Sequence, residues 1–174
     1  MDLSQKTNGD LFALLASVMR ELRDRKLIRT ANNPVADLGE LLFCGAMHWK
    51  RGDNQGKDID ATTQAKEKVQ IKARRMTRDK DSDRSGTIYD KDGFDLVALA
   101  MFDPDFRIKR AIIIPRHIAL IYLRWSNRQK GWYVSLTKAF WKEPELIDVT
   151  DRLARHCEEV FLRSAGHELV QGCV

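Results

Sequence analysis

A strict alternation of apolar and polar side chains marks residues 69–74, which read Val-Gln-Ile-Lys-Ala-Arg. Alternation with a period of two predicts a half-buried β-strand, because successive side chains of a strand point to opposite faces of a sheet. Gln70, Lys72 and Arg74 are therefore expected on one face, while the three apolar residues between them face a core. An amide oxygen, an ammonium and a guanidinium would then stand in a row.

The same alternation occurs just before this strand, in Asp58-Ile59-Asp60. It predicts a preceding strand with both carboxylates on one face, and residues 62–66 are the expected hairpin connection. If the two strands pair, an aspartate lies close to Gln70 and Lys72. The sequence therefore predicts that acidic, amide and basic groups meet on neighbouring strands.

The remaining pattern predicts a single α/β domain over residues 1–174, with a mixed four- to five-stranded sheet flanked by helices. Apolar residues at three-to-four spacing predict an N-terminal helix at 10–26, with Asp10 as its N-cap, and a second helix that begins after Pro34 and reaches about Met47. The core is expected over about 34–136. Its further elements are strands at 95–102, 106–114 and 132–136 and a short helix after Pro115, and a C-terminal helical segment follows at about 148–165.

Composition excludes several classes of protein. The chain has 174 residues, of which 43% are hydrophobic, so it can build a core and is not intrinsically disordered. No uncharged apolar run approaches the roughly 20 residues that a membrane-spanning helix needs, so no membrane partner is expected. The three cysteines are widely spaced and odd in number, which favours reduced thiols and a cytoplasmic location.

The charge is slightly basic and unevenly distributed. The chain has 30 Lys and Arg residues against 25 Asp and Glu, a formal net charge of +5. Basic residues gather between Lys66 and Arg84, in the middle of the chain rather than in a tail. This distribution indicates a polyanionic partner more strongly than the total charge does. Five residues are the expected contacts to nucleic-acid phosphates: Arg74, Arg75, Arg78, Arg84 and Ser85.

The acidic and basic groups together are those that metal-assisted hydrolysis of a phosphodiester requires. A hard cation such as Mg²⁺ takes oxygen ligands, usually one or two carboxylates with phosphate oxygens and water. A lysine beside it can orient the attacking water and stabilise the charge of the transition state. Glu40, on the helix expected before the sheet, would supply a third acidic group.

Glu40, then Gly56-Lys57-Asp58, then Val69-Gln70-Ile71-Lys72 resembles the PD-(D/E)XK, or restriction-endonuclease-like, superfamily, in particular a bacterial branch with a QIKAR-type strand. The order of predicted elements from about Pro34 to Leu136 also matches the core of that superfamily. The resemblance implies a Mg²⁺- or Mn²⁺-dependent DNA endonuclease, with a role in restriction or phage defence. It implies that Asp58, Gln70 and Glu40 hold the metal, with a main-chain carbonyl near Ile71, and that Lys72 is the catalytic lysine.

One residue departs from the pattern of the superfamily. Gln70 stands where Glu or Asp is usual, and a neutral amide lowers the affinity for a cation. Asp60 or Glu67 could restore the missing charge. Alternatively, the protein keeps the fold and binds nucleic acid without cleaving it, and a third alternative is a protein–protein interaction domain. Cutting both strands of a duplex would suggest a two-fold homodimer, although no residue marks an interface.

Overall fold

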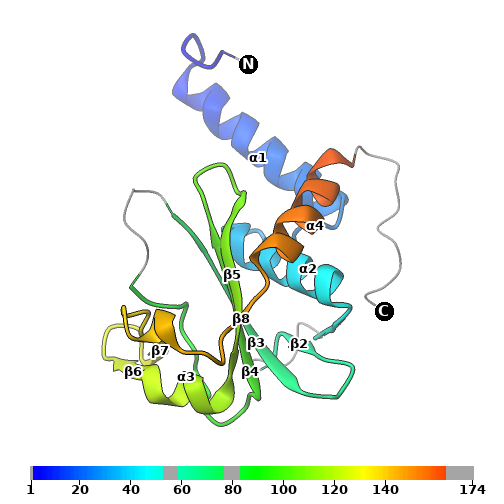
Figure 1. Cartoon of the computed structure of the whole chain (residues 1–174). Helices are drawn as coiled ribbons and strands as arrows, with labels where there is room; N and C mark the ends of the chain where they lie inside the picture. The colour runs from blue at the N-terminus through cyan, green and yellow to red at the C-terminus, as the bar shows by residue number, and fades with distance from the viewer. Residues whose placement is uncertain (1, 53–58, 77–82, 164–174) are drawn as a thin grey trace.

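The computed structural model describes residues 2–52, 59–76 and 83–163, which form an α/β fold (Figure 1). The helices are α1 (Asn8–Asp24), α2 (Val35–Met47), α3 (Arg116–Tyr122) and α4 (Thr150–Leu162), with a short 3-10 helix, η1 (Phe140–Lys142). The longer strands are β3 (Lys68–Arg75), β4 (Leu96–Phe102) and β5 (Ile108–Pro115). The shorter ones are β1 (Lys50–Arg51), β2 (Ala61–Thr62), β6 (Leu123–Ser126), β7 (Gly131–Val134) and β8 (Ile147–Asp148).

The main sheet is mixed and has six strands in the order β1-β2-β3-β4-β5-β8. Only β3 and β4 pair in parallel; the other neighbours are antiparallel. The α/β class and the mixed sheet are confirmed, but the predicted size of four to five strands is wrong. The edge strands β1 and β8 have two residues each, too few for an alternating pattern to show. The strand expected at 132–136 is β7, which pairs with β6 in a separate hairpin.

Two apolar clusters cover the two faces of the sheet. Helices α2 and α4 pack on one face, where Leu42, Phe43 and Leu153 are buried against residues of β3, β4 and β5. On the other face, α3, the β6–β7 hairpin and η1 enclose Leu99, Ile114 and Phe140. Because α4 contributes the buried Leu153, Cys157 and Val160 to the first cluster, the hydrophobic core extends beyond residue 136 to Val160.

Helix α1 is confirmed as a helix, but it packs differently from a core helix. Thr7, not Asp10, is its N-cap, and Asp10 at the third position completes a capping box with it. None of the residues of α1 is buried; Phe12 is 75% and Leu15 is 55% exposed. Figure 1 shows α1 extending away from the sheet. The apolar side chains of α1 therefore follow the local helical repeat, and none of them is buried by another described residue.

None of the helices in the described ranges is long and apolar enough to cross a membrane.

Gly39 sets the distance between α2 and β3. A Cβ atom on Gly39 would lie 2.6 Å from the Cβ of Ala73, so only glycine lets the helix approach the strand this closely. We expect Gly39→Ala to lower the free energy of unfolding by about 1–3 kcal/mol, the usual cost of overpacking. The matched control is Gly9→Ala in α1, where the nearest atom lies at 3.7 Å. This control should be neutral or stabilising by up to about 1 kcal/mol in urea unfolding, and equal effects at both positions would contradict the assignment.

Candidate active site

Asp60 lies where the hairpin of β2 and β3 begins. Strand β2 pairs with only the first part of β3, at Lys68 and Val69, so among the described residues the edge of β3 has an opening beyond that point. Asp60 turns its carboxylate into this opening, and its Oδ2 accepts a hydrogen bond of 2.7 Å from the main-chain N–H of Ile71. The predicted pairing of an aspartate with the Gln-x-Lys strand is therefore confirmed for Asp60, which precedes β2 as part of a bend instead of belonging to a strand.

The ammonium of Lys72 lies beside the same carboxylate. Its Nζ is 3.5 Å from Oδ2 of Asp60, and both side chains are largely shielded, with 17% and 24% exposure. A Cβ atom on Gly86 would lie 3.2 Å from Cδ of Lys72, so the aliphatic stem of the lysine packs closely on this glycine. The ion pair with Asp60 therefore fixes the ammonium of Lys72, and Gly86 fixes its aliphatic stem.

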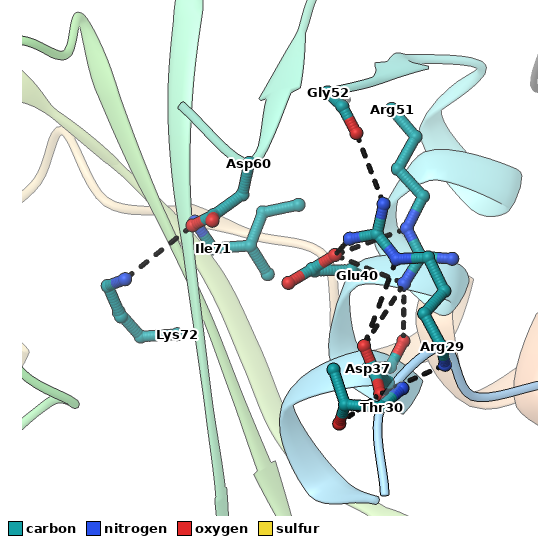
Figure 2. Close-up of polar contacts among 9 residues, drawn as sticks. All are labelled: Arg29, Thr30, Asp37, Glu40, Arg51, Gly52, Asp60, Ile71 and Lys72. Atoms are coloured by element: carbon teal, nitrogen blue, oxygen red, sulfur yellow. Dashed lines mark hydrogen bonds and ion pairs between the residues drawn. The ribbon is translucent and has the colours of Figure 1, made fainter. Parts of the chain in front are cut away.

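Glu40 faces the site from α2 and is held by two arginines. Its Oε2 accepts hydrogen bonds from Arg29 Nη2 and, at 3.2 and 3.1 Å, from Nε and Nη2 of Arg51. All these bonds end on one oxygen, and Figure 2 shows Asp60 between Glu40 and Lys72. The other oxygen, Oε1, accepts no hydrogen bond from a described residue. It remains available to a ligand on the side where Asp60 lies.

Asp37, one turn before Glu40, anchors the same arginines. It is 4% exposed, and its Oδ2 accepts three hydrogen bonds: 3.0 Å from Arg29 N, 2.9 Å from Thr30 N and 2.9 Å from Thr30 Oγ1. Burial raises the pKa of this carboxyl, but the hydrogen bonds from Thr30 and Arg29 outweigh it and bring the pKa below its ordinary value. Asp37 is therefore a structural carboxylate that fixes the loop before α2.

The pKa of Glu40 depends in part on the charge of Asp60. Burial raises the pKa of Glu40 above its ordinary value, and the negative charge of Asp60 adds to this rise, whereas Arg51 and Arg29 oppose it. The two carboxylates thus repel each other across the site. A cation bound between them would relieve this repulsion.

Three oxygen atoms of the site suit a hard cation. The first is Oε1 of Glu40. The second is Oδ1 of Asp60, which also accepts no hydrogen bond from a described residue. In a strand, the N–H and C=O of one residue point to the same side, so the Ile71 carbonyl faces the open edge to which its N–H points. No cluster of three or more His, Cys, Asp or Glu side chains occurs in the described ranges. Two carboxylates with a carbonyl and water are nevertheless the usual complement of Mg²⁺, so the residues fit this ion.

The other predicted ligands take different positions. Asp58 lies outside the described residues. Gln70 is buried at 4% exposure on the same face of β3 as Lys72. Glu67 is exposed in the hairpin turn, where its Oε2 accepts a hydrogen bond of 3.0 Å from Thr63 Oγ1. Of the two residues proposed to restore the missing charge, only Asp60 reaches the site.

The basic residues expected to contact DNA are divided between the two faces of the sheet. Arg74 lies on the face of Lys72 and donates a hydrogen bond of 3.2 Å to the carbonyl of Arg84. Arg75 points to the opposite face, where it stacks over Phe106. The guanidinium of Arg84 lies over the ring of Tyr133. Arg78 lies outside the described residues.

Ser85 is placed in the interior and not on the expected DNA-contacting surface. It is 2% exposed, its hydroxyl accepts a hydrogen bond of 2.9 Å from Val134 N, and it donates one of 2.8 Å to the carbonyl of Gly86. These bonds tie the segment before Gly86 to β7. Ser85 thus supports the glycine that packs against Lys72.

Three residues of the site are absent from the sequence prediction: Arg29, Arg51 and Gly86. The arginines come from a loop and from a two-residue strand, where no periodic pattern marks them. Asp37 and Glu40, three apart on the predicted helix, could have indicated that one helix face needs cationic partners. Nothing in the sequence shows which of the many basic residues these partners are.

No known family model matches the chain, and no curated protein matches it in sequence. The function must therefore be argued from the geometry of the site.

Proposed function

We propose that the protein is a Mg²⁺- or Mn²⁺-dependent DNA endonuclease of restriction-endonuclease-like fold. The observation that carries the proposal is the position of Asp60, whose carboxylate lies 3.5 Å from the Lys72 ammonium and is electrostatically coupled to Glu40. An acidic pair beside a lysine, at an open sheet edge, is the arrangement that hydrolysis of a phosphodiester needs. The predicted role of Asp58 as a further metal ligand stays part of the proposal.

Asp60, Glu40 and the Ile71 carbonyl would hold the cation. When bound, the cation would polarise the phosphate and lower the pKa of the attacking water. Lys72 orients the water and places a positive charge where negative charge gathers in the transition state. Asp60 keeps the ammonium in place, and Arg29 and Arg51 keep Glu40 turned toward the site.

The test is cleavage of a labelled DNA duplex with Mg²⁺ or Mn²⁺, comparing wild type with Asp60→Asn. Asparagine keeps an oxygen for the Ile71 N–H but removes the charge. We expect the cleavage rate to fall about 100-fold or more, because a bound cation contributes several kcal/mol to the transition state. Glu67→Gln, which changes an exposed carboxylate of the same hairpin, should stay within about twofold of wild type. Undiminished cleavage by Asp60→Asn would refute the site.

A second candidate function is DNA binding without cleavage. Among the described residues of the site, the charges of Asp37, Glu40 and Asp60 are matched by those of Arg29, Arg51 and Lys72, and Gln70 adds none. A set of residues with no net charge attracts a cation weakly. Salt-dependent DNA binding without cleavage under either metal would favour this function. Unchanged mobility of labelled DNA at low salt would instead favour a protein–protein interaction domain.

A further inference from the structure

A cavity of about 490 Å³ lies beside the end of β4 and the beginning of β5 and shares no lining residue with the candidate active site. Met101 and Arg110 line it from these strands, and Trp141 lines it from η1. Its volume falls within the range of sites for small organic ligands, so it has room for a nucleotide.

The register of the sheet connects this cavity to the active site. Arg74 of β3 is paired with Met101 of β4, which is paired in turn with Arg110 of β5. Directly paired residues share one face of a sheet, and Lys72, two positions before Arg74, shares it too. From the spacing of strands and residues, the backbone positions of Lys72 and Arg110 are roughly 12 Å apart. Lys72, Arg74 and Arg110 therefore share this face, and the buried Met101 lies between the two arginines.

Arg110 is oriented by an aromatic ring. Its guanidinium carbon lies 3.8 Å from the centre of the Trp141 ring, and that ring packs edge-to-face against the buried Phe140, with 5.0 Å between centroids. Stacking uses the face of a guanidinium and leaves the N–H groups on its edge available. Arg110 donates no hydrogen bond to a described residue and forms no ion pair with one. Its N–H groups are therefore held in place without a hydrogen bond to a described residue, although its charge acts on the carboxylate of Asp148.

Asp148, the last residue of β8, and Asp151, in the first turn of α4, also line the cavity. Oδ1 of Asp148 accepts a hydrogen bond of 2.8 Å from Thr150 N. Asp151 lies in the first turn of α4, where the positive end of the helix dipole offsets its charge. The hydrogen bonds from Thr150 and the charge of Arg110 both lower the pKa of Asp148, so this carboxylate offsets part of the positive charge of Arg110 on one side of the cavity.

We propose that Arg74 and Arg110 bind backbone phosphates of a DNA strand that runs from Lys72 to this cavity, and that Trp141 is the positioning residue of Arg110. The proposal rests on the proposed function and deepens it, because it gives the path of the DNA. With one phosphate per 3.4 Å of each strand in B-form DNA, the distance from Lys72 to Arg110 covers about three to four nucleotides.

The experiment measures binding of a fluorescent DNA duplex in EDTA, over a range of salt concentrations, for wild type and Arg110→Gln. We expect the variant to raise Kd about fivefold to tenfold at low salt. It should also reduce the slope of log K against log salt by about one, because one phosphate contact is lost. The control is Arg20→Gln, the same change of charge on the exposed surface of α1, which should leave the slope unchanged.

Variants of Trp141 test the positioning role. Trp141→Leu should weaken binding about threefold, whereas Trp141→Phe, which keeps an aromatic face, should restore most of the wild-type affinity. If Trp141 had only a structural role, both variants would lose thermal stability, and both would lose DNA affinity to the same extent.

The outcomes separate this inference from the proposed function. If wild type cleaves DNA but Arg110→Gln has the Kd and slope of Arg20→Gln, the DNA path is refuted and the nuclease remains. If Arg110→Gln shows the expected loss but wild type never cleaves, the path is supported and the proposed cleavage fails. Absence of DNA binding by wild type at low salt would overturn the inference.

Discussion

Replacing Lys72 with methionine should abolish most DNA cleavage while leaving the fold intact. The ammonium lies 3.5 Å from Asp60 and is the cation of β3 that contacts the proposed metal-binding carboxylate. Removing one charge that stabilises a transition state in a shielded site costs roughly 10²–10³-fold in kcat. Methionine keeps the unbranched stem that packs against Gly86, so the loss should fall on kcat and not on thermal stability.

The matched control for this variant is Lys68→Met. Lys68 belongs to the same strand but is exposed, and its main-chain N–H donates a hydrogen bond of 2.8 Å to Oδ2 of Asp95. Initial rates of duplex cleavage with saturating Mg²⁺ should be near wild type for this control. If Lys72→Met cleaves as fast as Lys68→Met, the lysine has no part in the chemistry and the proposed function loses its main support.

The largest effect on stability is expected for Asp37→Ala. This change leaves three donors, two of them main-chain N–H groups, without the carboxylate that they share. Removing one partner of a buried, hydrogen-bonded charge cluster typically costs about 3–5 kcal/mol. Urea unfolding at pH 7 should show this loss, whereas Asp24→Ala on exposed α1 should change the free energy of unfolding by no more than about 0.5 kcal/mol.

The effect of Asp37→Ala should also depend on pH. The pKa of Asp37 is lowered in the folded protein, so its contribution to stability is fully present above the ordinary pKa of aspartate. The contribution is lost as the pH falls through the lower, folded pKa. The difference between wild type and variant should therefore shrink at pH values below about 4. A difference that is constant between pH 7 and this range would mean that the charge of Asp37 does not stabilise the fold.

Asp37 also connects stability to the site. Asp37 Oδ1 lies 3.9 Å from Arg29 Nε and 3.8 Å from Arg51 Nη2, so the carboxylate that Asp37→Ala removes also holds the arginine pair that binds Glu40. Loss of Asp37 should therefore release Glu40 as well. The Asp37→Ala variant should therefore need a higher Mg²⁺ concentration for half-maximal cleavage, even under conditions where the protein remains folded.

Local patterns in the sequence were sufficient for most of the helices and strands. The alternation in residues 69–74 predicted β3 and its two faces, and the strand predicted at 95–102 is β4, which is buried on both faces. The helix after Pro34 was predicted with Glu40 on it, and in the structure Glu40 and Asp37 of this helix contact the same arginines. These features depend on the repeat of a strand or helix, which the sequence contains directly.

The sequence by itself thus determined the α/β class, the strand β3 and the face of β3 that carries Gln70, Lys72 and Arg74, and it indicated that an aspartate would meet this strand. The tertiary structure alone decided that Asp60 reaches Lys72 from a bend before β2 and that Arg29 and Arg51 hold Glu40. It also decided that Arg110 lies in register with Arg74, 36 positions later in the chain. The reason is physical: periodicity fixes the direction of a side chain within its own element, whereas contacts between elements depend on strand order, register and the close approach that Gly39 permits.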